Sequence, residues 1–260
     1  MKVLVTGATG TIGRKLVPVL EPDHELTLLS RGEQADPRYR RVDITDVHKV
    51  IDAAAGMDAV VHLAIATGQE ADHESHEFNL LRVDTNVKGT YNVFEAARQA
   101  GVKRVVFAST GSVAGGYATD EPYSAILTGD YDRVPRQWRR IQHDDPVRPN
   151  GMYAASKAAG EAIGRCFTEL HGLSIICLRL GRVEPKDQPL NAGHMVVFLA
   201  HRDCIQLIDC AVEAPDHVRF DIFFGTSANK WGIRDLEHAR EVIGYRPEFQ
   251  LNDWPLSPGS

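Results

Sequence analysis

The stretch MKVLVTGATGTIGRK occupies residues 1–15 and decides the fold. Residues 2–5 have the composition of a buried strand and residues 12–20 that of a helix. Gly7 lets the chain turn sharply off the strand, Gly10 leaves no Cβ where a pyrophosphate approaches the backbone, and Gly13 lets the helix pack close to the strand. The free N–H groups of the helix N-terminus then face the anion. We therefore interpret the stretch as a dinucleotide-binding loop rather than a bare turn.

The composition restricts the class of protein. The 260 residues carry a formal net charge of −6, which argues against a nucleic-acid or anionic-membrane partner. There is no run of eighteen apolar residues, and Met1 leads directly into a strand, so we expect a cytoplasmic protein without signal peptide or membrane span. The cysteines form no CxxC pair, and we expect them to be reduced core residues: Cys166, Cys177, Cys204 and Cys210.

A second predicted strand, residues 25–29, ends at Ser30 and Arg31. The adenosine ribose lies at this end of such a fold, where an acidic residue would accept hydrogen bonds from both ribose hydroxyls. Ser30 can instead donate to a 2′-phosphate, and Arg31 can pair with it. We therefore predict NADP(H), with NAD(H) as the second choice; the alternative is that Arg31 is a solvated loop cation. Asp43 and Ile44 follow a short third strand and are expected to contact the adenine.

Strands and helices alternate along most of the chain. Further strands are predicted at 40–42, 58–63, 102–109, 174–180 and 219–224, and helices at 46–55, 79–100, 153–170, 202–214 and 234–243. This alternation predicts an α/β fold, a doubly wound parallel sheet of the Rossmann type with its ligand crevice outside the carboxyl ends of the strands. We expect a dinucleotide-binding domain at 1–180, with an excursion at 118–149, and a small C-terminal substrate-binding part at 181–260 that interleaves with the last strand and helix.

A polar loop at residues 67–78 is longer than a simple connection and is assigned to the rim of the active site. His73 and His76, beside Glu70 and Glu74, have a spacing that a metal ion could use. A solvated acidic loop accounts for the same residues, so we expect no metal site.

The excursion at 118–149 has no clear helix or strand and carries Arg133, Arg136, Arg139 and Arg140. A structureless segment of this length in a compact domain is typical of a lid or a binding loop. A solvated, charged excursion accounts for it equally well. In the first case the arginines could hold a carboxylate or phosphate of a substrate.

Tyr153 and Lys157 stand four residues apart at the head of a predicted helix and therefore share a helix face. A phenol has a pKa of about 10, too high for a general base at neutral pH. A neighbouring ammonium and a positive nicotinamide ring favour the phenolate, and lowering the pKa by about three units needs about 4 kcal/mol. Thr110, at the end of a predicted strand, can hold the substrate oxygen while Tyr153 takes or gives its proton and hydride moves to or from the nicotinamide.

Motifs along nearly the whole chain resemble the extended short-chain dehydrogenases/reductases of the NAD-dependent epimerase/dehydratase family. They are GATGTIG at 7–13, HLAIA at 62–66, NVKGTYN at 86–92, VVFAST at 105–110, YAASK at 153–157 and LRLG at 178–181. The resemblance implies a catalytic set of Thr110, Tyr153 and Lys157, with Lys157 also holding the nicotinamide ribose. It implies Asn86 on a helix behind the site and Val183 near the nicotinamide amide.

The resemblance also implies a homodimer built from the helices at 86–100 and 153–170, although apolar helix faces also pack internally. Together with the residues discussed above, it defines a set of expected cofactor contacts. They are Gly7, Gly10, Thr11, Ile12, Gly13, Ser30, Arg31, Asp43, Ile44, Leu63, Ala64, Ala66, Asn86, Ser109, Tyr153, Lys157 and Val183.

The tail, AHRDCIQLI at 200–208 and FFGTSANKWGIRDLEHAREVIGYRPE at 223–248, is similar to the uronate dehydrogenases and to related archaeal hexose-phosphate dehydrogenases. The chain departs from those enzymes in three places. Gly111-Ser112 replaces an Asn-His pair, Ser30-Arg31 replaces an acidic residue, and Gly193-His194 lies where an arginine meets the uronate carboxylate. The expected substrate contacts are Gly111, Ser112, Arg133 and His194.

Three functions compete. A dehydrogenase of a small polyhydroxylated substrate, a sugar, uronate or sugar phosphate, is favoured because the region after Leu180 is short for a nucleotide-sugar enzyme. A sugar epimerase or dehydratase is second, but Gly111 and Ser112 offer neither the acid nor the base that elimination needs. A cofactor-binding regulator without turnover is third, and an intact catalytic set argues against it.

Overall fold

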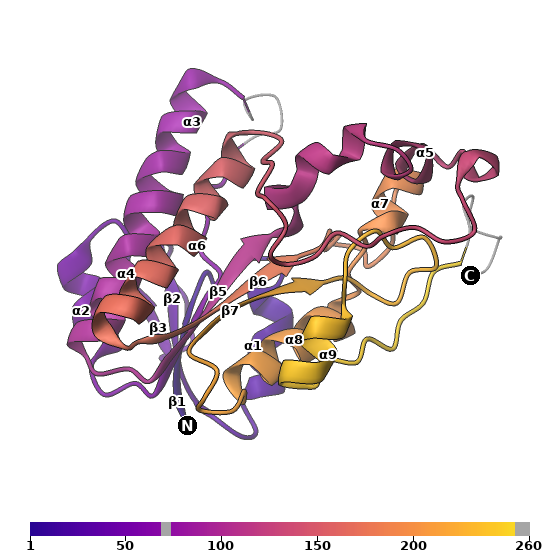
Figure 1. Cartoon of the computed structure of the whole chain (residues 1–260). Coiled ribbons are helices and arrows are strands. Elements are labelled where there is room, and N and C mark those ends of the chain that lie inside the picture. The colour runs from indigo at the N-terminus through magenta and orange to yellow at the C-terminus, as the bar shows by residue number, and fades with distance from the viewer. Residues whose placement is uncertain (69–73, 253–260) are drawn as a thin grey trace.

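The computed structural model describes residues 1–68 and 74–252 (Figure 1). Its centre is a seven-stranded sheet in the order β3-β2-β1-β4-β5-β6-β7, in which every neighbouring pair is parallel. The strands are β1 Lys2–Thr6, β2 Glu25–Ser30, β3 Tyr39–Arg41, β4 Ala59–His62, β5 Arg104–Thr110, β6 Ser174–Leu180 and β7 Phe220–Gly225. The strand order reverses between β1 and β4, the switch point at which such sheets bind ligands. The doubly wound Rossmann fold expected from the sequence is confirmed.

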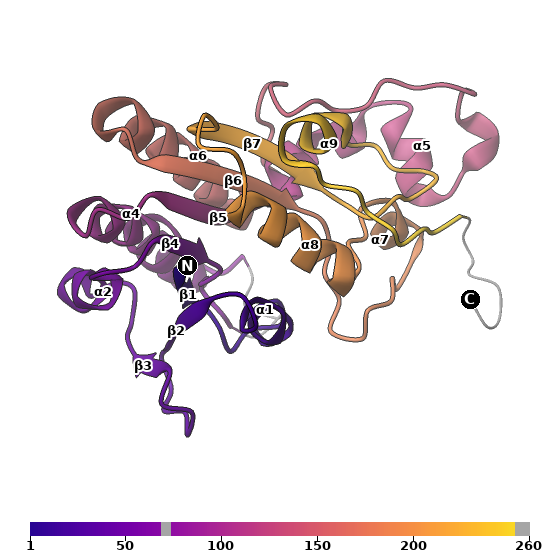
Figure 2. The same ribbon diagram turned by 90° about the horizontal axis from the view of Figure 1, so that it is seen from below.

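Helices cover both faces of the sheet, as Figure 2 shows from below. One face is covered by α1 Gly13–Leu20, α8 His201–Val212 and α9 Glu237–Ile243, and the other by α2 Val47–Ala54, α4 Gly89–Gln99 and α6 Met152–His171. Alternate residues of one strand enter opposite cores, since Val3 and Val5 pack on the first face and Leu4 on the second. The centre of the sheet is therefore buried on both sides, and every residue of β4, β5 and β6 is buried.

Two predicted segments differ from the structure. The helix expected at 79–100 is three consecutive pieces: α3 His76–Arg82, a π-helical turn Val83–Lys88, and α4. The excursion expected to lack secondary structure contains α5 Tyr123–Thr128 and a 3₁₀ turn Tyr131–Arg133, and it follows a 3₁₀ segment Gly111–Thr119. Pro122 at the N-cap and Gly129, left-handed with φ 77°, delimit α5; both signals were present in the sequence. A short helix α7, Ala192–Val196, lies beside α5 and was not predicted.

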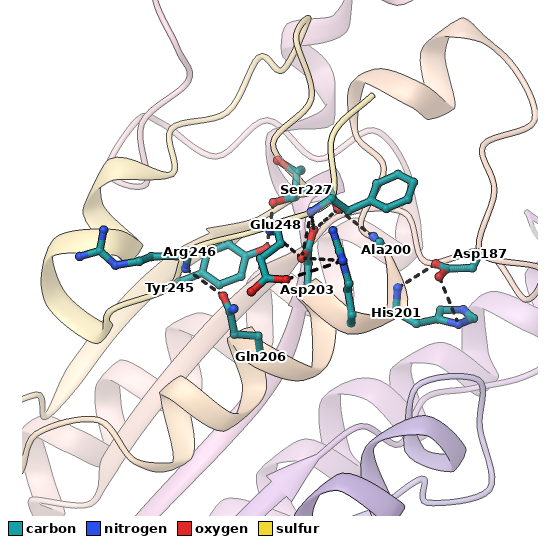
Figure 3. A network of polar contacts seen from close by, with 12 residues as sticks. Asp187, Ala200, His201, Asp203, Gln206, Ser227, Tyr245, Arg246 and Glu248 are labelled. Carbon is teal, nitrogen blue, oxygen red and sulfur yellow. Dashed lines mark hydrogen bonds and ion pairs between the residues drawn. The ribbon is translucent and has the colours of Figure 1, made fainter. Parts of the chain in front are cut away.

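Residues after β6 supply β7, α8 and α9 to the sheet and its cover. A buried network around Asp203 of α8 fastens the end of the described chain to this layer (Figure 3). The Asp203 carboxylate accepts from the Ser227 hydroxyl at 2.6 Å and from the backbone N–H of Glu248 at 2.9 Å. Nearby, His201 Nε2 lies 2.7 Å from the Glu184 carbonyl oxygen. The AHRD motif thus holds together segments that border the site described below.

The burial of the cysteines corrects one sequence expectation. Cys177 and Cys204 are buried, but Cys166 is exposed and Cys210 is only partly buried, so the expectation of four core cysteines was wrong for Cys166. Among the described residues no helix is both long and apolar enough to cross a bilayer.

Candidate active site

The glycine loop between β1 and α1 has the geometry expected of a dinucleotide-binding turn. Gly7 adopts a φ of +68°, and a Cβ there would lie 2.7 Å from the backbone N of Ala64 at the end of β4. A Cβ on Gly13 would lie 2.6 Å from both Cα and O of Ala8. Gly10 N donates to Gly7 O at 3.0 Å and closes the turn. Any side chain at positions 7 or 13 would therefore force the loop apart.

Two connected cavities run along this loop at the carboxyl ends of the strands. A cavity of about 260 Å³ extends from the loop to the ends of β2 and β3, and one of about 380 Å³ extends to the ends of β5 and β6. Most of the residues predicted to bind the cofactor line one or both: Gly7, Gly10, Thr11, Ile12, Gly13, Ser30, Arg31, Asp43, Ile44, Leu63, Ala64, Ser109, Tyr153, Lys157 and Val183. The structure thus brings together side chains from widely separated parts of the sequence in one elongated groove.

At the β2 end of the groove, Ser30 is buried and its hydroxyl accepts from the backbone N–H of Gly32 at 3.2 Å. The Arg31 guanidinium is exposed and donates to the Thr67 hydroxyl at 2.7 Å. Asp43 accepts from both the N–H and the hydroxyl of Thr45, at 2.9 and 2.8 Å. Among the described residues that line this end of the groove, Arg31 is the only cation, and it stands directly after β2 in place of an acidic residue.

Thr110, Tyr153 and Lys157 meet where the groove reaches β5 and the first turns of α6. Burial raises the pKa of the Tyr153 phenol above its ordinary value and outweighs a hydrogen bond with Thr110 and the charge of Arg82, both of which lower this pKa. Lys157 is 1% exposed; its Nζ donates to the Ala108 carbonyl at 2.7 Å and lies 4.7 Å from the centre of the Phe107 ring. Burial lowers the pKa of Lys157 to about 7.

Asn86 and Ala66 lie behind the groove rather than in its wall. The buried Asn86 side chain accepts from the Ala66 N–H at 2.7 Å and donates to the Ser156 hydroxyl at 3.0 Å. Ser156 in turn donates to the carbonyl of Tyr153 at 2.7 Å. Asn86, in the π-helical turn, therefore ties the segment after β4 to the first turn of the helix that carries Tyr153.

A second buried cluster, not identified from the sequence, supports the end of β5 from beneath. The Ser109 hydroxyl donates to Glu161 at 2.5 Å, and Arg179 of β6 donates to the same carboxylate at 3.0 and 2.8 Å. The side chains of Glu161 and Arg179 are 5% and 3% exposed. Ser109 was predicted as a cofactor contact; it lines the groove, but its hydroxyl is engaged by Glu161. The charge of Glu161 also opposes the lowering of the Lys157 pKa.

A further cavity of about 420 Å³ borders the groove at Thr110 and Tyr153. The residues that line both the cavity and the groove are Thr110, Tyr153, Leu180, Gly181 and Val183. Its remaining wall consists of Ser112, Arg182, Glu184, His194, Val197 and Arg234. It has the position of a substrate cavity, because it opens onto the same hydroxyl groups as the groove.

The predicted substrate contacts are distributed unevenly around this cavity. Ser112 and His194 line it, and His194 Nδ1 lies 3.4 Å from the Glu184 carboxylate, which also pairs with Arg182. Arg133 is not brought there: it is exposed, pairs with Glu121 at 2.6 Å and with Asp130 at 3.5 Å, and lines no cavity described here.

Arg234 was missed because nothing in its local sequence distinguishes it from a surface arginine. It reaches the cavity through long-range pairing: Ile141 N donates to the carbonyl of Ile233 at 2.8 Å, and Asp235 N donates to the carbonyl of Ile141 at 2.9 Å. The two bonds hold the backbone on either side of Arg234.

No metal site was predicted. The suggested pair His73 and His76 cannot be compared, since His73 and Glu70 lie outside the described residues. Elsewhere, His143, Asp221 and His238 place their ligand atoms within 4.8 Å of one another. The two imidazoles are stacked at 3.8 Å with planes 6° apart, so their lone pairs lie in two separate, nearly parallel planes and do not converge on one ion.

Comparison with known proteins agrees with this geometry. Residues 3–206 match the NAD dependent epimerase/dehydratase family, and the chain belongs to that family. It is 31% identical to the NAD-dependent glucose-6-phosphate dehydrogenase of Haloferax volcanii over 98% of this chain and 97% of that protein. It is 33% identical to the L-arabinose 1-dehydrogenase (NAD(P)(+)) of the same organism over 95% of this chain and 96% of that protein.

Among solved structures, a mutant of the uronate dehydrogenase from Agrobacterium tumefaciens complexed with NAD superposes with a TM-score of 0.77 at 28% identity, covering 96% of this chain and 85% of that one. The family resemblance drawn from the sequence motifs is thereby confirmed. These relatives are dehydrogenases of an aldose, a sugar phosphate and a uronate.

Proposed function

We propose that this protein is an NAD(P)-dependent dehydrogenase of a small polyhydroxylated substrate: a sugar, a uronate or a sugar phosphate. The observation that carries the proposal is that Thr110 and Tyr153 form a wall common to the cofactor groove and the second cavity. A substrate hydroxyl in one cavity can therefore lie next to a redox cofactor in the other. The activities printed for the similar proteins support the same reaction class.

Thr110 and Tyr153 have different roles in the oxidation of an alcohol. The Thr110 hydroxyl holds the substrate oxygen, and the Tyr153 phenolate takes its proton. Bound NAD(P)⁺ supplies the hydride acceptor. In the free protein burial keeps the Tyr153 pKa above its ordinary value despite the charge of Arg82, so a further positive charge is needed to make the phenol a base at neutral pH. Lys157, one helical turn along the same face, supplies that charge when it is protonated.

The test is a nicotinamide absorbance assay of the purified chain with a panel of aldoses, uronates and sugar phosphates. We expect at least one substrate to reduce the cofactor in a single oxidation. Interconversion of sugars without a change in the cofactor redox state would instead assign the chain to the epimerases of its family.

For the cofactor we propose NADP(H) ahead of NAD(H). The support is the pair Ser30 and Arg31 at the end of β2, with the Arg31 guanidinium exposed at the mouth of the groove. We expect Arg31→Ala to weaken NADP(H) binding by about tenfold, the loss of one charge-assisted hydrogen bond, and to leave NAD(H) binding unchanged. Fluorescence titration of both reduced cofactors checks this, with Arg40→Ala as the matched control; equal effects on the two cofactors would reject the assignment.

We also propose a homodimer formed through α4 and α6. Large apolar side chains are exposed on or beside these helices, including Leu80 (53%), Val83 (44%), Tyr91 (48%) and Leu170 (71%). Burying such a face on a second copy removes apolar surface from water. Sedimentation at micromolar concentration should show twice the chain mass for the wild type and one chain mass for Tyr91→Glu. The control is Leu190→Glu, which places a charge at another exposed leucine, distant in sequence, and should leave the dimer intact. A monomeric wild type would contradict the proposal.

A further inference from the structure

The Arg234 guanidinium stands out in the substrate cavity because its charge has no partner. Among the described residues it makes no ion pair, and its Nη1 is buried without a hydrogen-bond partner. The other cations near it are compensated: Arg182 pairs with Glu184, and Arg179 pairs with Glu161 at 2.8 Å. Its Cζ lies 5.6 Å from the centre of the Phe224 ring. A guanidinium withdrawn from water without an acceptor is costly unless a ligand provides one.

The position of this guanidinium depends on the glycine that follows the catalytic threonine. A Cβ built on Gly111 would overlap Cζ, Nη1 and Nη2 of Arg234. Only glycine at position 111 therefore lets the guanidinium lie against the backbone at the end of β5, next to Thr110. Gly111 and the position of the Arg234 guanidinium are therefore sterically coupled.

The charged side chains of the cavity wall leave an excess of positive charge. Glu184 is the acidic residue of the cavity wall and is already shared by Arg182 and His194. Burial and the charge of Arg179 lower the pKa of Arg234 to about 10, which leaves it charged at neutral pH. The cavity therefore has an unneutralised positive charge beside the reacting hydroxyl.

We propose that Arg234 determines substrate specificity by binding an anionic oxygen group of the substrate, a carboxylate or a phosphate, and that Gly111 is the residue that makes room for it. This rests on the proposed function, which places the substrate in this cavity. A planar guanidinium suits either anion, because both accept two parallel hydrogen bonds.

The test measures binding separately from turnover. Dissociation constants of D-glucose, D-glucuronate and D-glucose 6-phosphate are measured by calorimetry with NADPH present, so that no oxidation takes place. We expect the wild type to bind at least one anion tenfold or more tightly than glucose, and the comparison of the two anions identifies the group. Arg234→Met should lose this preference while binding glucose as before, and Arg234→Lys should keep part of it.

Gly111→Ala provides an independent variant that leaves the arginine in the sequence. Its Cβ displaces the guanidinium, so we expect the same loss of anion preference, and the double variant Gly111→Ala/Arg234→Met should lose no more than either one. Arg240→Met, on the exposed face of α9, is the matched control and should keep the wild-type preference.

The proposal is overturned if the wild type shows no preference for an anion, or if Arg234→Met weakens glucose and the anions equally, as a purely structural role on Phe224 would require. The outcome is distinguishable from failure of the proposed function. Selective, Arg234-dependent anion binding without cofactor reduction by any sugar would refute the dehydrogenase and leave the anion site standing.

Discussion

Tyr153→Phe is expected to lower kcat by about 10² to 10⁴-fold, the usual contribution of a general acid–base residue. The change removes the phenolic oxygen that lies beside Thr110 in the wall common to both cavities and keeps the ring that packs there. Cofactor affinity should therefore stay within about twofold of the wild type, since the groove keeps its shape and its other contacts. Steady-state kinetics and a cofactor titration on the same preparation measure both quantities.

The matched control is Tyr123→Phe, which removes a phenol that donates to the Arg139 carbonyl at 3.0 Å, away from the groove. Its kcat should be close to that of the wild type. Retained activity in Tyr153→Phe, or an equal loss in both variants, would remove Tyr153 from the mechanism.

Glu161→Ala is expected to destabilise the fold by about 3–5 kcal/mol, because it leaves the buried Arg179 guanidinium without its carboxylate. The Ser109 hydroxyl loses its acceptor in the same variant. Denaturant unfolding measures the change in the free energy of unfolding. Replacing both charges, Glu161→Leu with Arg179→Met, should cost less than Glu161→Ala alone, since no unpaired charge remains.

The surface pair Arg133–Glu121 is the control for this second prediction. Both side chains are more than half exposed, at 62% and 52%. Glu121→Ala should therefore change stability by no more than about 1 kcal/mol. A loss in Glu161→Ala as small as that of the surface variant would show that the Glu161–Arg179 pair does not hold the end of β5 in place.

The parallel sheet was predictable because its signals are local. The glycines at 7, 10 and 13 carry steric requirements that can be read without knowing the rest of the chain, and the strands at β5 and β6 are apolar runs between breakers. The π-helical turn Val83–Lys88 was not predictable, since a single extra residue per turn leaves almost no trace in a helical pattern. The short helix α5 had its Pro122 and Gly129 signals, but six residues are too few for a helical period to be recognised.

The residues of the candidate site also fall into two groups, those that local sequence signals predict and those that depend on long-range contacts. Most residues that line the groove lie just after a predicted strand, and Tyr153 and Lys157 share one face of a predicted helix, so the predicted elements already brought them close together. Arg234 and Glu161 reach the site through a long-range β-bridge and through the burial of one helix face, neither of which is encoded near the residue itself. The four arginines between residues 133 and 140 suggested an anion site because they lie close together in the sequence. In the structure Arg133 pairs with Glu121, and Arg139 pairs with Asp145.

The central claim, oxidation of a sugar-type substrate by a nicotinamide cofactor at the Thr110–Tyr153 wall, is tested most directly by the stoichiometry of one reaction. The oxidised product and the reduced cofactor are quantified together in the same sample, for the wild type and for Tyr153→Phe. The account predicts one reduced cofactor for each product molecule over many turnovers, and at least about a hundredfold less of both from the variant in the same time. Sugar conversion with no net reduction of the cofactor, or conversion by Tyr153→Phe at a rate close to that of the wild type, would contradict it.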